Sequence, residues 1–295
     1  MTRSRFTGAM TALVTPMARG AVDYDALTAL VDWQIASGID AIVAVGTTGE
    51  SATLDFDEHI AVVGHCVKVA RGRIPIIAGA GGNATSEALE LSKRSADVGA
   101  DGLLHVTPYY NRPNQDGLYR HYEAIARAVP LPILLYNVPT RTGCDLLPDT
   151  IVRLAEVDNI VGVKEATGNM VRAAELIARV GDRLAIISGD DGTAFPLYAL
   201  GGHGVISVVS NVDPTRMARM WDAAAAGDWA AARAEHFALR HLMELLFVEP
   251  SPAPTKACLA LTGRIADELR SPLYPVTAAL RERLRVELGK LGLAS

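Results

Sequence analysis

Short apolar, β-prone runs alternate with longer stretches of helical periodicity along most of the chain. The alternation repeats eight times before residue 227, and each repeat takes about 20 to 34 residues, as a strand and a returning helix require. The expected strands begin near Ala9, Ala41, Pro75, Gly102, Pro132, Ile160, Leu184 and Gly204. Strict alternation with short connections indicates a parallel sheet, and eight units favour a closed (β/α)8 TIM barrel over an open doubly wound sheet.

Residues typical of helix ends punctuate the longer stretches. Aspartate or threonine stands before four of the expected helices, at Asp23, Asp55, Thr85 and Asp213. Side chains of this kind accept hydrogen bonds from the first free N–H groups of a helix. These positions therefore predict where four of the outer helices begin.

The alternation stops after Gly227, and the rest of the chain has helical periodicity only. Helices are expected over 228–247, 255–261 and 275–288, and the proline-rich stretch 249–254 is expected to exclude helix. We therefore predict two domains: a catalytic barrel over 1–227 and a small C-terminal helical annex over 228–295. The absence of a low-complexity linker predicts that the annex packs on the barrel.

Composition narrows the class of protein. Of the 295 residues, 49% are hydrophobic and 21% are charged, which is typical of a globular chain with a large core. A net charge of -5 without a long basic run argues against nucleic acid or an anionic membrane as partner. The chain shows no secretory signal and no apolar run of membrane-spanning length, so a cytoplasmic location is expected. The three cysteines lack a paired spacing and are expected to be free thiols.

The apolar strand expected at 160–164 ends in a lysine, Lys164. Burial disfavours an ammonium ion and lowers its pKa, which converts a lysine into an amine nucleophile able to form a Schiff base. The alternative is a surface lysine, or one that forms an ion pair with the adjacent Glu165. Lys164 alone does not decide between these interpretations.

Polar residues also follow other expected strands, at the end of a barrel where active sites form. Thr47 and Thr48 follow the strand at 41–45, and their hydroxyls could hold a carboxylate or relay a proton, although a simple turn is the alternative. Tyr110 and Tyr136 could shuttle protons or only pack, and Arg141 could bind a carboxylate or lie free on the surface.

Two acidic residues, Asp190 and Asp191, hint at a metal site. No other ligand cluster accompanies them, so we interpret them as a turn and a helix cap, and expect no metal. His105 is interpreted as a hydrogen-bonded core residue. An amine, several hydroxyls and an arginine are thus expected together at the strand ends of one barrel. This combination predicts imine chemistry on a keto acid.

Six motifs carry a resemblance to a known family. They are GTTGES (46–51), TPYYNRP (107–113), YNVPTRTG (136–143), KEATGN (164–169), SGDD (188–191) and GVISV (204–208). In order and spacing, from about Gly8 to Lys256, the chain resembles the dihydrodipicolinate synthase family, which belongs to the class I aldolase superfamily of N-acetylneuraminate lyase. The resemblance implies condensation of pyruvate with L-aspartate 4-semialdehyde to 4-hydroxy-tetrahydrodipicolinate, in lysine biosynthesis through diaminopimelate.

The resemblance also implies roles for particular residues. Lys164 would form the pyruvate imine, with no organic cofactor and no metal. Tyr136, Thr48 and Tyr110 would relay protons, Tyr110 reaching in from a neighbouring subunit of a homotetramer built as a dimer of dimers.

The implied binding residues lie around the same lysine. Thr47, Thr48 and the backbone near Ile206 would hold the pyruvate carboxylate. Arg141 would bind the carboxylate of the semialdehyde, and Gly189 would line the pocket.

Alternatives remain open from the sequence. A lyase of 2-keto-3-deoxy sugar acids or of N-acetylneuraminate would share Lys164 and Tyr136 but usually lacks an arginine like Arg141. A silent homologue that only binds keto acids is a hypothesis from another class. Phe56 stands where lysine-sensitive members of the family often carry a polar residue, which argues against inhibition by lysine.

Overall fold

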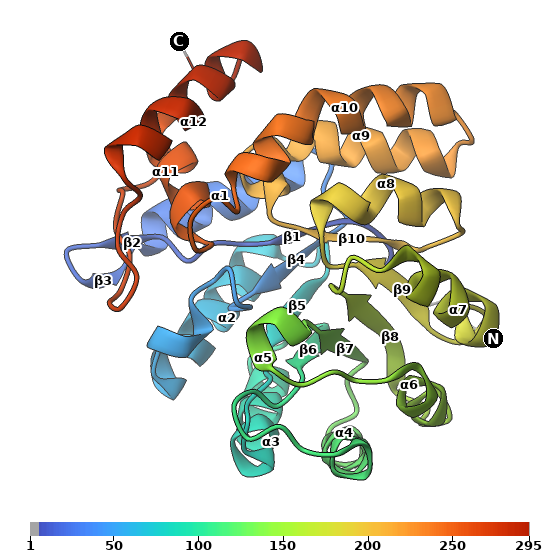
Figure 1. The fold of residues 1–295 in the computed structure, drawn as a ribbon. Coiled ribbons are helices and arrows are strands. Elements are labelled where there is room, and N and C mark those ends of the chain that lie inside the picture. Colours follow the sequence, from blue (N-terminus) through green and yellow to red (C-terminus); the bar gives the residue numbers. More distant parts are fainter. Residues whose placement is uncertain (1–5, 295) are drawn as a thin grey trace.

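Eight parallel strands close into a barrel in the computed structural model, which describes residues 6–294 (Figure 1). Around the barrel the order is β1-β10-β9-β8-β7-β6-β5-β4, with β1 paired to both β10 and β4. The strands are β1 (Gly8–Ala12), β4 (Ala41–Ala44), β5 (Ile76–Gly79), β6 (Gly102–Val106), β7 (Ile133–Asn137), β8 (Ile160–Glu165), β9 (Ala185–Ser188) and β10 (Gly204–Ser207). Each begins at the predicted residue or one residue from it, so the predicted (β/α)8 barrel is confirmed.

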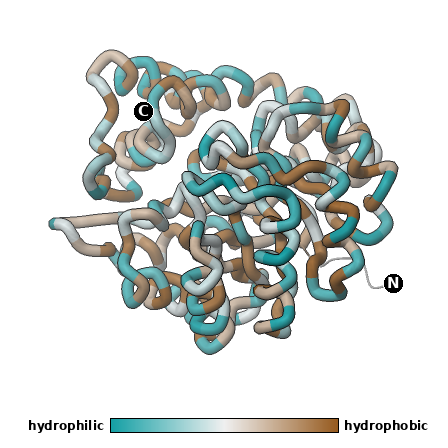
Figure 2. Tube along the Cα trace, turned by 60° about the horizontal axis from the view of Figure 1, so that its bottom comes forward, coloured by the Kyte–Doolittle hydropathy of each residue, from teal (hydrophilic) through white to brown (hydrophobic). Residues whose placement is uncertain are grey.

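Helices follow the strands and form the outer layer. They are α1 (Tyr24–Ala36), α2 (Phe56–Ala70), α3 (Thr85–Asp97), α4 (Gln115–Ala128), α6 (Pro148–Leu154), α7 (Met170–Val180), α8 (Asp191–Ala199) and α9 (Pro214–Ala225). Hydrophobic and hydrophilic residues are interspersed along these helices (Figure 2), as expected when one face packs on the barrel and the other meets solvent. No helix within residues 6–294 is both long enough and apolar enough to cross a membrane.

The predicted helix starts are mostly confirmed. The side chains of Asp23, Asp55 and Asp213 accept hydrogen bonds from the first turns of α1, α2 and α9. Thr85 is instead the first residue of α3, and its hydroxyl hydrogen-bonds to Nδ1 of His121 on α4. A tertiary contact therefore takes the side chain that the sequence pattern assigned to capping.

Several short elements that the periodicity does not predict follow strands, at the carboxyl end of the barrel. They are the hairpin β2 (Met17–Ala18) and β3 (Ala21–Val22), the helix α5 (Pro139–Thr142), and the 3-10 turns η1 (Ser51–Thr53) and η2 (Val209–Asn211). Each is too short to show a hydrophobic period. Of these, η1 begins at the last residue of the GTTGES motif, and α5 lies within the YNVPTRTG motif.

Three further helices follow residue 227: α10 (Trp229–Leu245), α11 (Ala253–Leu261) and α12 (Ala278–Lys290). The expectation that 249–254 excludes helix is wrong at its end, because α11 begins at Ala253 with Pro254 in its first turn. A proline is tolerated there, because the N–H groups of the first turn have no partner within the helix. Buried side chains of α10, α11 and α12 share one hydrophobic cluster with those of α8, β10 and α9. The C-terminal helices thus pack on the barrel, while the division into two domains at residue 227 stays a prediction.

Candidate active site

Lys164 occupies the end of β8, between Tyr136 on β7 and Ile187 on β9. Its side chain is buried, and Nζ lies 4.3 Å from the centroid of the Tyr136 ring. The pKa of the amine is lowered to about 7, mainly by burial; the carboxylate of Asp191 opposes this shift, and the positive charge of Arg141 adds to it. At neutral pH a large share of this amine is therefore uncharged and nucleophilic.

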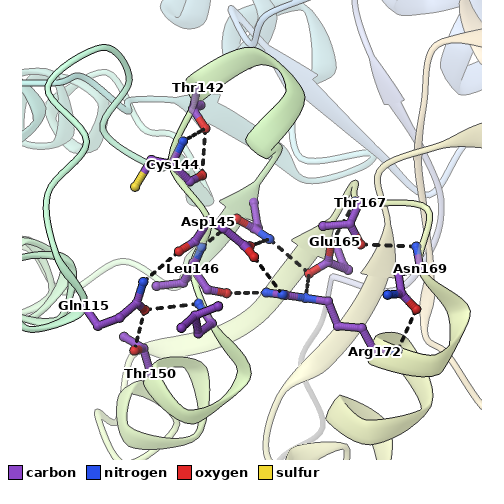
Figure 3. A network of polar contacts seen from close by, with 12 residues as sticks. Gln115, Thr142, Cys144, Asp145, Leu146, Thr150, Glu165, Thr167, Asn169 and Arg172 are labelled. Carbon is purple, nitrogen blue, oxygen red and sulfur yellow. Dashed lines mark hydrogen bonds and ion pairs between the residues drawn. The ribbon is translucent and has the colours of Figure 1, made fainter.

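The alternative partner for Lys164, the adjacent Glu165, is engaged elsewhere. Successive side chains of a strand point to opposite faces. The carboxylate of Glu165 forms an ion pair with Arg172 on α7, at 3.0 Å (Figure 3). The structure therefore contradicts the interpretation of Lys164 as a lysine paired with Glu165 or exposed on the surface.

Most of the predicted site residues line one cavity at the carboxyl end of the strands. Its volume is about 330 Å³. The predicted residues along its wall are Thr47, Thr48, Tyr136, Arg141, Lys164 and Gly189. A smaller cavity of about 30 Å³ is also lined by Thr47 and Tyr136.

Gly189 has no side chain, which leaves space beside Lys164. A Cβ at this position would come within 2.6 Å of the Cβ of Ala166 and 3.0 Å of Cε of Lys164. Only glycine leaves the lysine side chain room beside β9.

The hydroxyl of Tyr136 is hydrogen-bonded to Thr47, where the sequence analysis named Thr48 for the relay. Burial raises the pKa of the Tyr136 hydroxyl, and the nearby Arg141 and the hydrogen bond with Thr47 oppose that shift. Thr48 lines the cavity and is buried. Adjacent threonines at a strand end point in different directions, and only tertiary structure reveals which of them contacts the tyrosine.

Tyr110 does not reach the cavity of its own chain. Its side chain is 90% exposed, its φ is +73°, and its backbone N–H donates to the carbonyl of Thr142 at 3.2 Å. This placement leaves the ring available to a second molecule. The expectation that it enters a neighbouring subunit's site stays a prediction.

Ile206 is fully buried within β10 and does not line the cavity; Val208, two residues further on, does. The N–H groups of Val208 and Val209 donate to Oδ2 of the buried Asp191, at 3.0 and 3.1 Å. Asp190 caps α8 by accepting from Gly192, as predicted. No group of three or more metal-ligating side chains occurs within residues 6–294.

The C-terminal segment contributes residues that sequence reasoning missed. Phe247 and Ser251 line the cavity. Lys256 on α11 forms an ion pair with Glu50 of the GTTGES motif, and neither side chain is exposed. The signal that the sequence offers here is the proline-rich stretch 249–254, which contains Ser251.

Comparisons with known proteins find similarity to one family over nearly the whole chain. The model of the Dihydrodipicolinate synthetase family matches residues 5–291. The chain is 50% identical to a 4-hydroxy-tetrahydrodipicolinate synthase of Pelobacter propionicus, over 98% of this chain and 99% of that protein. It is 52% identical to a protein of the same name from Alcanivorax borkumensis, over 97% of this chain and 98% of that one.

A solved structure is also similar to this chain over nearly its whole length. A dihydrodipicolinate synthase of Acinetobacter baumannii, complexed with pyruvate, matches with a TM-score of 0.96 and 49% identity, covering 97% of this chain and 99% of that chain. Coverage of this extent includes the C-terminal helices as well as the barrel.

Proposed function

Because this chain belongs to the dihydrodipicolinate synthetase family, we propose how its own residues carry out the reaction of that family. The activity is the condensation of pyruvate with L-aspartate 4-semialdehyde to 4-hydroxy-tetrahydrodipicolinate, in lysine biosynthesis. It is a lyase reaction of class I aldolase type, which uses a lysine Schiff base and no external cofactor. Cleavage of sugar acids is not favoured, because the relatives are synthases.

Lys164 is the residue that we assign to the Schiff base. Its neutral amine attacks the C2 carbonyl carbon of pyruvate, and the resulting carbinolamine loses water to leave an imine. Loss of a C3 proton gives an enamine, whose C3 attacks the aldehyde carbon of the semialdehyde. The amino group of the semialdehyde then displaces Lys164 from the imine carbon, which closes the ring and frees the enzyme. The observation that carries this assignment is the buried amine at the base of the cavity, with a pKa of about 7.

Each of these steps moves a proton beside the amine, and Tyr136 is the group placed to move it. Its ring lies against Nζ, and Thr47 shares its hydroxyl hydrogen bond. We therefore assign the relay to Tyr136 and Thr47, with Tyr110 of a second subunit as the outer member. Thr48, in the wall of the cavity, remains available to the substrate.

The two carboxylates need separate recognition. Thr47 and Thr48 line the cavity together with Lys164, and their hydroxyls suit the carboxylate of pyruvate, near the backbone that follows Ile206. Arg141, on α5 at the wall of the same cavity, suits bidentate capture of the semialdehyde carboxylate. Gly189, in the same wall, leaves room for the side chain of Lys164.

Two exposed surfaces support a homotetramer built as a dimer of dimers. Tyr110 projects from one, and an apolar face on α7, α8 and α10 forms the other. The exposed side chains of that face are Val171, Leu200, Trp229 and Phe237. Large exposed apolar patches mark protein–protein contacts. The biosynthetic role also supports the expected cytoplasmic location.

Chemical trapping tests the assignment of Lys164. Incubation with pyruvate and reduction with borohydride should add the mass of one reduced pyruvate, and peptide mapping should place it on Lys164. Lys164→Met should abolish the adduct, whereas Lys93→Met, at an exposed lysine of α3, should not. Reversible pyruvate binding without a reducible adduct would instead support the binding-only homologue.

A second experiment tests Arg141. Arg141→Ala should raise the KM for the semialdehyde at least tenfold while leaving adduct formation with pyruvate largely intact at about pH 9, where the amine of Lys164 is neutral with or without the arginine. An equal loss with both substrates would contradict the assignment.

Subunit mixing tests Tyr110 and the assembly together. Tyr110→Ala and Lys164→Met are each expected to be inactive alone. If Tyr110 acts across an interface, reassociated mixtures should regain up to about a quarter of normal activity, because half of the dimers are hybrids with one intact site. No recovery in hybrids confirmed by mass would contradict the assignment.

A further inference from the structure

Behind the active-site lysine, a second side chain is buried at the same strand end. Glu165 points away from the cavity, and its side chain is only 3% exposed. Its Oε1 accepts a hydrogen bond from the N–H of Thr167 at 2.8 Å. Its Oε2 accepts from Nε of Arg172 at 3.0 Å and from Nδ2 of Asn137 at 3.3 Å. The backbone that presents Lys164 is thus held from its far side.

The guanidinium of Arg172 is the centre of this network (Figure 3). It comes from the first turn of α7 and is 11% exposed. Besides Glu165, it donates through Nη1 to Oδ2 of Asp145, at 3.2 Å, and through Nη2 to the carbonyl of Leu146. One side chain therefore joins the end of β8 to the segment that follows α5.

Asn137 closes the network from the other direction. It ends β7 one residue after Tyr136, donates from Nδ2 to Oδ1 of Asp145 at 2.8 Å, and accepts from the N–H of Leu146 at 3.0 Å. Residues 138–144, which include α5 and Arg141, therefore form a loop whose two ends are tied together by Asn137, Asp145 and Leu146.

We infer that Arg172 is a positioning residue for the reaction: it fixes the strand end that carries Lys164 relative to the loop that carries Arg141. The inference rests on the roles proposed above for these two residues. Arg172 does not line the cavity, and acts through Glu165, Asp145 and the carbonyl of Leu146.

A planar guanidinium is required for both connections at once. Its donors lie in a rigid fork and reach acceptors in different directions, whereas the ammonium of a lysine is a single point charge. Arg172→Lys should keep the positive charge beside the buried Glu165 but lose the contacts with Asp145 and Leu146. The two functions of Arg172 can therefore be separated by one conservative substitution.

The experiment compares Arg172→Lys and Arg172→Met with Arg179→Met. Arg179 lies on the same helix and contacts Asp149 and Glu175, at a partly exposed site far from Glu165. For each variant we would measure the rate of adduct formation with pyruvate, kcat, the KM for the semialdehyde, and Tm.

Arg172→Lys should form the adduct within threefold of the normal rate but raise the KM for the semialdehyde at least tenfold. Arg172→Met should also slow adduct formation at least tenfold, because the strand end loses its anchor. Arg179→Met should change neither constant. If Arg172→Met does not fold, Arg172→Lys and Asp145→Asn decide. The latter replaces one of the two acceptor oxygens that bind Arg172 and Asn137, and it should raise the same KM.

A purely structural role gives a different result. If the Arg172 variants lower Tm while adduct formation and both kinetic constants match those of Arg179→Met below Tm, the inference is overturned. Failure of the proposed function is seen separately, in the unmodified enzyme, as the absence of a Lys164 adduct.

Discussion

The amine of Lys164 should titrate near neutrality, and this can be measured through the rate of imine formation. Burial is the main cause that brings its pKa from the ordinary 10.5 to about 7. A difference of about 3.5 in pKa corresponds to about 5 kcal/mol of preference for the neutral amine. At pH 8 about nine-tenths of such an amine is neutral, against about 0.3% of an ordinary lysine, a ratio of about 300.

The assay follows the formation of the reduced pyruvate adduct over time, by intact mass after borohydride quenching, from about pH 5.5 to about pH 9.5. The rate should rise through a midpoint of about 7 and then level off. Arg141→Met should move the midpoint upward, because it removes a positive charge that lowers the pKa. A rate that still rises tenfold per pH unit above pH 9 would refute the account of a desolvated amine.

The same shift predicts a pH dependence of stability, with a definite sign. The folded pKa lies below that of the unfolded chain, so between about pH 7 and 10.5 the unfolded chain binds the extra proton. This group should therefore make the free energy of unfolding rise with pH across that window. Lys164→Met removes the cost of the buried charge and should stabilise the protein at pH 7, by up to about 4 kcal/mol in urea unfolding. Destabilisation by this substitution would contradict the reasoning.

Three further predictions concern neighbours of the site. Lys256→Met leaves the buried carboxylate of Glu50 without its counter-charge and should lower the free energy of unfolding in urea by about 3–5 kcal/mol. The double variant Glu50→Gln/Lys256→Met should recover most of this loss. An equal loss in both variants would argue against a stabilising ion pair between the two residues. Tyr136→Phe should slow adduct formation about 100-fold or more without loss of Tm, and a normal rate would exclude Tyr136 from the relay. Gly189→Ala places a Cβ 3.0 Å from Cε of Lys164 and should reduce adduct formation more than tenfold; an unchanged rate would show that the lysine has room to move.

Much of the fold follows from local pattern. The eight strands begin where apolar runs begin, because a strand buried on both faces has to be apolar along its length. The starts of α1, α2 and α9 follow from capping aspartates for an equally local reason. Elements of two to four residues, such as β2, β3 and α5, could not be predicted, since they are shorter than one hydrophobic period.

The site, like the fold, has features that the sequence could predict and features that it could not. Lys164, Tyr136, Arg141, Thr47, Thr48 and Gly189 could be predicted, because parallel strands bring their carboxyl ends to one rim and the family motifs fall there. Pattern did not show that Thr47 and not Thr48 bonds to Tyr136, because that depends on the direction of each side chain.

Distance along the chain explains what else was missed. Lys256 meets Glu50 across more than 200 residues, and Phe247 and Ser251 line the cavity only because the connection between α10 and α11 returns to it. The sequence alone determined which residues end the strands, and therefore the kind of chemistry available. The tertiary structure alone decided which groups surround the amine of Lys164, because its low pKa comes from burial and neighbouring charges that no local pattern records.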